Sequence, residues 1–299
     1  MNSARRPHPI ALVLVAVVAQ ALLVLAFVVP GHDPEPHELP VAVQGPPELT
    51  RQLQQRAGDA FELKTVTNGE QAVLDREAYG ALIPQERTLL VASAASFPVS
   101  QLLTSAFADA APTVRDIRPL DEDDPRGTVL NLMLIPLIVV CLPLGLLLAR
   151  EGSRRTTAIA STAFAALAGL AVIAVTSGWL GVIPGDFLPL AGVAALLVGA
   201  VVLPAAGLVR LIGPAGLGVV ALVVFFIGIP ASGAASAPEL LPGFWRAVGP
   251  LLPAGAGATA LRNVAYFDGA AIAGPLLVLA AFCALGLALV AVSPRVDRQ

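Results

Sequence analysis

One stretch between two long apolar segments, residues 238–269 (PELLPGFWRAVGPLLPAGAGATALRNVAYFDG), holds four charged residues: Glu239, Arg246, Arg262 and Asp268. An arginine beside hydrocarbon is costly unless it is paired or hydrated. We therefore expect ion pairs of Arg262 with Asp268 and of Arg246 with Glu239, or arginines that donate hydrogen bonds to backbone carbonyls. In the alternative interpretation, both arginines only extend to lipid headgroups as anchors.

The same stretch is too rich in Pro and Gly to form one membrane-spanning helix. Phe244 and Trp245 are aromatic residues of the kind that settles at membrane–water interfaces. Apolar spacing predicts two short helices, broken at Gly249–Pro250 and again within Pro253–Gly257. They would lie at one bilayer face as re-entrant or interfacial helices, and paired arginines would hold them as a plug over the bundle. A simple interfacial loop with aromatic anchors is the competing interpretation.

Catalytic and metal-binding patterns are weak. The sequence has no G-x-x-x-x-G-K-[ST] motif and no Ser-His-Asp or Cys-His set, so we expect no enzyme activity, no cofactor and no ATP site in this chain. Prolines interrupt the His32–Glu38 cluster, and no regular element fixes its side chains, so we expect no metal site there. The four acids at 121–124 fit a solvated linker better than a divalent-cation site.

Composition indicates a membrane protein. Of 299 residues, 56% are hydrophobic and 13% charged, whereas a soluble domain carries about a quarter charged residues. Length and apolarity predict six spans. The first could instead be a signal peptide, but its apolar core is long and no good cleavage site follows. The spans are expected at residues 9–30, 129–149, 156–179, 187–209, 211–230 and 270–292.

Between the first two spans, residues 31–127 hold sixteen of the 21 acidic residues and predict a water-facing domain. Strands alternating with helices suggest a small α/β sheet. Its apolar pattern looks self-contained, so 38–120 is expected to fold alone. No basic patch suggests nucleic acid. We expect strands at 39–44, 61–67, 79–84, 88–94 and 113–120, and helices at 47–57, 68–77 and 99–110.

Arginine distribution predicts the orientation. More arginines in short segments lie at one face than at the other, and positive residues favour the cytoplasm. This places both termini inside and the acidic domain outside, in a multi-pass protein of a bacterial plasma membrane. The inner set is Arg5, Arg6, Arg150, Arg154, Arg155, Arg210, Arg295 and Arg298, and the outer set is Arg126, Arg246 and Arg262.

Residues 238–269 also resemble the end of ABC-2-type membrane permeases, most closely the YhgE/Pip-like branch. The resemblance lies in Pro242 with Phe244 and Trp245, then Leu252–Pro253, then Leu261–Arg262, ahead of a last apolar span. The segment YGALIP in the acidic domain is similar to that branch too. The resemblance implies an exporter subunit for a lipid-like or amphiphilic substrate. It also implies membrane lipid contacts, a homodimer or paralogue heterodimer, and ATP bound by a separate P-loop ATPase chain.

The expected architecture is thus an α-helical integral membrane protein, divided as 1–30, 31–127 and 128–299. One feature departs from the permease pattern. The turn between the second and third spans, REGSRR, is too short for a robust coupling helix, and only eight residues precede the first span. A non-transporting scaffold or accessory subunit of a secretion or envelope complex is therefore the alternative.

Overall fold

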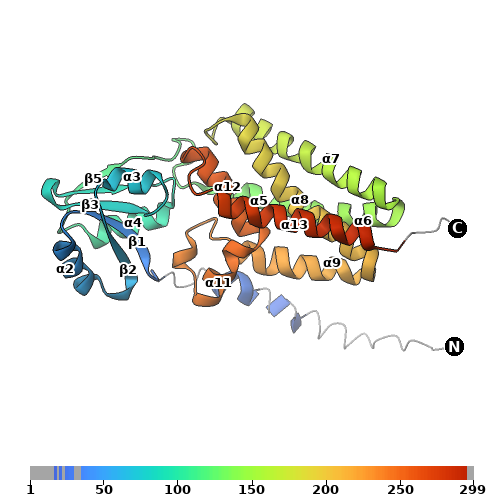
Figure 1. Ribbon diagram of the computed structural model, residues 1–299, viewed down its shortest axis with the longest axis horizontal. Coiled ribbons are helices and arrows are strands. Elements are labelled where there is room, and N and C mark those ends of the chain that lie inside the picture. The colour runs from blue at the N-terminus through green and yellow to red at the C-terminus, as the bar shows by residue number, and fades with distance from the viewer. Residues whose placement is uncertain (1–16, 19, 22–23, 30–34, 295–299) are drawn as a thin grey trace.

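The computed structural model describes residues 17–18, 20–21, 24–29 and 35–294. A sheet domain lies at one end of a bundle of long helices, with α11 and α12 at the bundle end that faces it (Figure 1). Most of the expected first span, residues 9–30, falls outside the described residues, as do His32 and Asp33 of the cluster before the sheet domain.

The sheet has five strands in the order β2-β1-β3-β4-β5. β1 pairs in parallel with β2 and β3, β4 pairs in parallel with β5, and only β3–β4 is antiparallel. The strands are β1 (Leu39–Gln44), β2 (Phe61–Val66), β3 (Gly80–Ile83), β4 (Thr88–Val91) and β5 (Thr113–Asp116). The helices are α2 (Pro47–Ala57), η1 (Gly58–Ala60), α3 (Gly69–Leu74), η2 (Pro84–Glu86) and α4 (Phe97–Ala106).

Local chemistry explains where these helices start. The side chains of Asn68 and Ser96 accept hydrogen bonds from the backbone N–H groups of Gln71 and Val99, which satisfies free donors of the first turn. Every strand and helix expected in this domain is present, with small shifts at the ends.

The core of the sheet domain continues into the helical part of the chain. Ala237, Leu240 and Phe267 belong to the same buried cluster as Leu82 and Leu90. The prediction of a self-contained apolar pattern in residues 38–120 is therefore wrong, because the domain buries part of its surface against residues from the other half of the chain.

Four helices are long and apolar enough to cross a membrane: Thr128–Glu151, Arg154–Trp179, Phe187–Ile212 and Ala273–Val292. They comprise α5 (Thr128–Val139) with α6 (Cys141–Glu151), α7 (Arg154–Ile173) with the π-helical η3 (Ala174–Trp179), α8 (Phe187–Ile212) and α13 (Ala273–Val292). These correspond to four of the six spans that we expected.

The expected span at 211–230 differs in the structure. Helix α8 runs on to Ile212, and Gly213 then turns the chain with a φ of 72°. This leaves a shorter apolar helix, Ala215–Ala231, built from α9 (Ala215–Val220), the π-helical η4 (Ala221–Gly228) and α10 (Ile229–Ala231). The expected count of six is thus not found, since four helices in the described part of the chain are long enough to span.

Helix α8 is the centre of the bundle and contacts α6, α7, α9, α12 and α13. In its most apolar window 78% of the residues are buried, against 17% in α13, so α13 exposes most of its apolar surface. Gly169 and Gly286 allow neighbouring helices to approach α8, because a Cβ on either glycine would overlap α8 backbone atoms. Small residues of this kind drive close helix packing in membranes.

At the bundle end away from the sheet domain, Arg210 joins three helices. Its guanidinium donates to the carbonyl of Gly152 at 2.7 Å, the carbonyl of Ala149 at 3.1 Å and the Ser293 hydroxyl at 3.0 Å. Arg154 also donates to the carbonyl of Ser293. Carbonyls at helix ends lack intrahelical partners, and Arg210 satisfies two of them at the end of α6 while it binds the Ser293 hydroxyl just after α13.

Candidate functional site

The stretch 238–269 forms a helical hairpin against the sheet domain. It consists of η5 (Pro238–Leu240), α11 (Gly243–Val248), η6 (Gly249–Leu251) and α12 (Pro253–Tyr266). The expected break at Gly249–Pro250 is present. The second expected break is not, because Pro253 opens α12, where proline has no N–H to lose, and the helix continues through Gly257.

Two glycines let the hairpin fold tightly. A Cβ on Gly249 would overlap the carbonyl oxygen of Ala231, and one on Gly255 would overlap the carbonyl oxygen of Gly249. Side chains at these positions would push α10, η6 and α12 apart. The glycines of this stretch are therefore packing positions and not flexible joints.

Polar side chains of the hairpin form hydrogen bonds with the sheet domain and with the segment that enters it. The Tyr79 hydroxyl donates to Oε2 of Glu239 at 2.7 Å, and Nε of Arg76 donates to Oδ1 of Asn263 at 3.1 Å. Nη1 of Arg246 donates to the backbone carbonyl of His37 at 3.0 Å. These contacts join residues 160 to 209 positions apart in the sequence.

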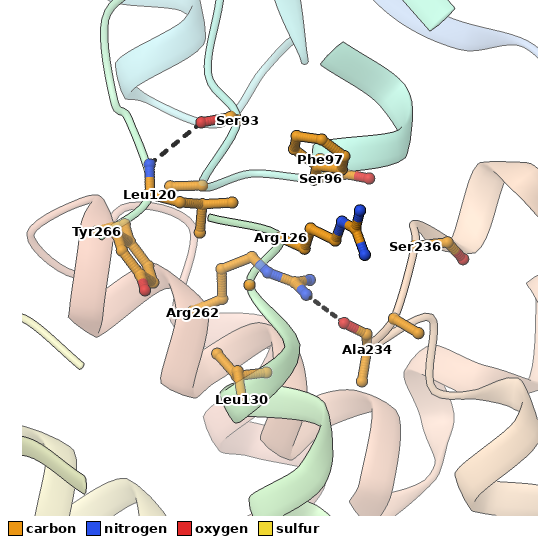
Figure 2. A pocket seen from close by; sticks show the side chains of 13 residues that line it. Ser93, Ser96, Phe97, Leu120, Arg126, Leu130, Ala234, Ser236, Arg262 and Tyr266 are labelled. Atoms are coloured by element: carbon orange, nitrogen blue, oxygen red, sulfur yellow. Dashed lines mark hydrogen bonds between the residues drawn. The ribbon is translucent and has the colours of Figure 1, made fainter. Parts of the chain in front are cut away.

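Arg262 lies inside the junction, with 8% of its surface exposed. It donates to the backbone carbonyl of Ala234 at 2.7 Å, a contact that Figure 2 shows. Burial, and secondarily the charge of Arg76, lower the pKa of Arg262 to about 10. The group still carries its charge at neutral pH, and it is held by a carbonyl and not by a carboxylate.

The two ion pairs expected within the stretch are not formed. Asp268 follows α12 in a left-handed turn, with a φ of 52°, and its carboxylate pairs with Arg118 of the sheet domain at 3.2 Å. Arg246 lies 3.5 Å from Glu38. The sheet domain supplies nearer partners than the hairpin does, and linear spacing does not report them. Arg262 instead donates to a backbone carbonyl, which is the other contact that we expected for these arginines.

Trp245 packs edge-on against Phe244, with ring centroids 5.4 Å apart. Phe244 is 60% exposed and Leu251 is 63% exposed, so this side of the hairpin presents apolar side chains outward. An amphipathic helix with such a face suits a membrane surface.

A cleft of about 530 Å³ opens between the sheet domain, the hairpin and the start of α13, and we call it the junction cleft. Ligand pockets typically measure 300–1,000 Å³. Its lining combines polar and apolar residues. The polar lining is Arg76, Tyr79, Glu239, Arg246, Thr259, Arg262 and Asn263, and the apolar lining includes Leu251, Ala256, Pro275 and Val278.

Positive charge dominates the junction cleft, since three arginines face one carboxylate. That carboxylate, Glu239, already accepts the Tyr79 hydroxyl. Burial, followed by the charge of Glu239, raises the pKa of Tyr79 well above its usual range, so the phenol stays protonated and donating. The arrangement can bind a molecule that carries both an anionic and an apolar group.

Arg262 also lines a second, small cavity of about 20 Å³ (Figure 2). Arg126, Ser96 and Tyr266 are among its lining residues. It has room for about one water molecule. Arg262 lines both cavities and thus forms part of the wall between them.

Of the polar residues in the junction cleft, sequence reasoning found Glu239, Arg246 and Arg262 and missed Arg76, Tyr79 and Asn263. Asn263 is 1% exposed. A buried amide next to an arginine in an apolar helix is a signal that could have been used. No linear signal links Arg76 to Asn263, which are 187 positions apart.

The acids at 121–124 have a structural role. Asp124 is 3% exposed, and its two oxygens accept the N–H groups of Thr128 at 2.8 Å and Val129 at 2.9 Å, at the start of α5. A carboxylate there complements the free donors of a helix N-terminus. Across the described residues, no group of three His, Cys, Asp or Glu side chains is arranged to hold a metal ion.

Comparison with family models, with curated proteins and with solved structures finds no match for this chain. The junction cleft and its chemistry are therefore the basis for a functional assignment.

Proposed function

We propose that this chain is the membrane subunit of an exporter that moves a lipid-like or amphiphilic substrate outward, driven by a separate P-loop ATPase. One observation carries the proposal. The junction cleft combines three arginines with apolar side chains, and part of its apolar lining belongs to α13, a helix with mostly exposed apolar surface. A site of this kind fits a molecule with a charged head and an apolar tail.

The resemblance of residues 238–269 to ABC-2-type permeases, YhgE/Pip-like branch, supports the same function. In that reading the hairpin with Arg246, Arg262, Glu239, Asp268 and Trp245 closes the outer end of the bundle. Two copies, or this chain with a paralogue, would line the pathway in a bacterial plasma membrane. Both termini would be cytoplasmic and the sheet domain outside.

Reconstitution tests the proposal. The full chain and the ATPase encoded by a neighbouring reading frame are placed in liposomes that contain NBD-labelled phospholipids, and dithionite quenching reports the leaflet of the label. We expect ATP-dependent movement of label between leaflets. The control is the same ATPase with its P-loop lysine replaced. Movement that is equal with and without ATP hydrolysis would contradict the export function.

A second candidate, a non-transporting scaffold or accessory subunit, is favoured by one specific observation. Helix α6 ends at Glu151 and α7 begins at Arg154, so only Gly152 and Ser153 separate them. A connection of two residues provides little surface for contact with an ATPase. If the tagged chain co-purifies with secretion or envelope components after crosslinking, and no ATPase does, the scaffold function replaces the export function.

A further inference from the structure

The arginines of the junction cleft have unused hydrogen-bonding capacity. A guanidinium carries five N–H donors. Among the described residues, Arg76 and Arg262 each direct a single nitrogen at a protein acceptor, namely Asn263 and Ala234, and Arg246 directs one nitrogen at both the His37 carbonyl and the Glu38 carboxylate. The remaining donors need water or a ligand.

Arg76 is held in a fixed orientation. Its guanidinium lies 4.7 Å from the ring centroid of Phe267 and 5.3 Å from that of Tyr79. Contact with two aromatic rings and one hydrogen bond to Asn263 immobilises the planar group before any ligand arrives. Preorganisation of this kind lowers the entropic cost of binding.

Arginine pairs bind phosphate well, because the planar fork matches phosphate oxygens and because several forks can share one phosphate. Three arginines line this cleft against two nearby carboxylates: Glu239 in the lining, which Tyr79 already hydrogen-bonds, and Glu38, which lies 3.5 Å from Arg246. An added anion therefore compensates the excess positive charge. A cationic or a neutral headgroup does not.

The apolar lining of the cleft indicates what is attached to the phosphate. It includes Leu251 of the hairpin and Pro275 and Val278 of α13, and the neighbouring Leu277 on α13 is 70% exposed. An acyl or prenyl chain that leaves the cleft here continues along the exposed apolar face of α13. Free phosphate makes no use of this surface.

We infer that the junction cleft binds the phosphate headgroup of an anionic amphiphile through Arg76, Arg246 and Arg262, with the tail lying along α13. The inference that this amphiphile is also the exported substrate rests on the function proposed above. Binding is measured without an ATPase, so loss of headgroup preference and loss of transport are separate results.

The full chain with Trp179→Phe leaves Trp245, beside Arg246, as the single tryptophan. This protein is placed in phosphatidylcholine nanodiscs that contain brominated phosphatidylglycerol or brominated phosphatidylcholine, and quenching of Trp245 is followed against mole fraction. We expect half-maximal quenching at a mole fraction about tenfold lower for phosphatidylglycerol, which corresponds to about 1.4 kcal/mol.

Two variants test whether the headgroup binds in the junction cleft. Arg76→Gln removes one cleft cation, and Thr259→Glu adds an anion without removing any arginine. Each is expected to abolish the preference. Arg115→Gln is the matched control, because Arg115 lies in β5, is 58% exposed, pairs with Glu70 and does not line the cleft. It should retain the preference.

Three results would overturn the inference. The first is equal quenching by the two lipids in the parent protein. The second is a preference that persists in Thr259→Glu, which would place the lipid elsewhere. The third is displacement of the lipid by inorganic phosphate at a comparable concentration, which would show that the tail contributes nothing and that the ligand is free phosphate.

Discussion

Tyr79 donates its hydroxyl to Glu239 at 2.7 Å, and this bond joins the sheet domain to the hairpin across 160 positions of sequence. The phenol is buried, while the carboxylate is half-buried. The contact sits in the wall of the junction cleft, so it couples the position of the sheet domain to the shape of the site.

Tyr79→Phe should lower the free energy of unfolding by about 1.5 kcal/mol, the low end for a hydrogen bond to a charged group, because Glu239 keeps some water. Denaturant titration of the purified protein measures it. Tyr266→Phe is the matched control and should change stability by less than about 0.5 kcal/mol. In a double-mutant cycle, Glu239→Gln should add little to Tyr79→Phe; full additivity would mean that the bond contributes nothing.

The two tyrosines of the chain should resist ionisation in the folded protein. Burial raises the pKa of Tyr266 to about 12 and that of Tyr79 further, from an ordinary 10.0. Near-ultraviolet absorbance should therefore show almost no tyrosinate at pH 10, where the unfolded chain is half titrated. Because the folded state retains these protons, the tyrosine contribution to stability is full below pH 10 and is lost as pH rises through the folded pKa values. A normal titration curve in the folded protein would refute this.

Arg262→Met should cost about 1–3 kcal/mol, because the buried carbonyl of Ala234 loses its donor. Arg262→Lys keeps the charge but loses the planar fork, so we expect a loss there as well. The control is Arg126→Met, at an exposed position that lines the same small cavity. If Arg262→Lys equals the parent protein in stability, the arginine is only a headgroup anchor.

Asp268→Asn should act independently of Arg262, since Asp268 pairs with Arg118 and is 92% exposed. Its own effect should be within about 1 kcal/mol, as is usual for exposed pairs. The effects of Asp268→Asn and Arg262→Lys should add. A coupling energy well above the error of the unfolding measurement would revive a direct Arg262–Asp268 interaction.

Arg210→Lys should destabilise the bundle end by about 2 kcal/mol, because one ammonium cannot reach all three acceptors at Ala149, Gly152 and Ser293. Arg155→Lys is the control on the same face, where the side chain is exposed. Thermal unfolding of the detergent-solubilised variants measures the difference. Equal unfolding temperatures for the two variants would show that the Arg210 contacts are not stabilising.

Orientation is tested by cysteine labelling in a background in which Cys141 and Cys283 are replaced by alanine. We expect Ser105→Cys in the sheet domain to react with an impermeant maleimide in intact cells and Ser153→Cys to react only after disruption. Both serines are exposed, whereas Ser96 is buried and unsuitable. The reverse pattern would invert the proposed topology.

The local structure of this protein could be predicted from its residues alone. Alternating apolar residues set β1 to β5, capping by Asn68 and Ser96 set the starts of α3 and α4, and long uncharged runs set the four long helices. These features depend on neighbours in the chain, through side-chain direction, cap hydrogen bonds and the length of apolar runs. The position of the hairpin between two apolar segments was readable for the same reason.

Only the tertiary structure decided which charges meet. Glu239, Arg246, Arg262 and Asp268 looked like partners because they lie close in sequence, yet three of them bind side chains of the sheet domain or the segment that enters it, and Arg262 binds a carbonyl. Arg76 entered the cleft from a distant helix end. A charged side chain binds the nearest group of complementary charge or hydrogen-bonding capacity in space, and docking of the sheet domain, driven by burial of Leu240 and Phe267, determines which groups are near.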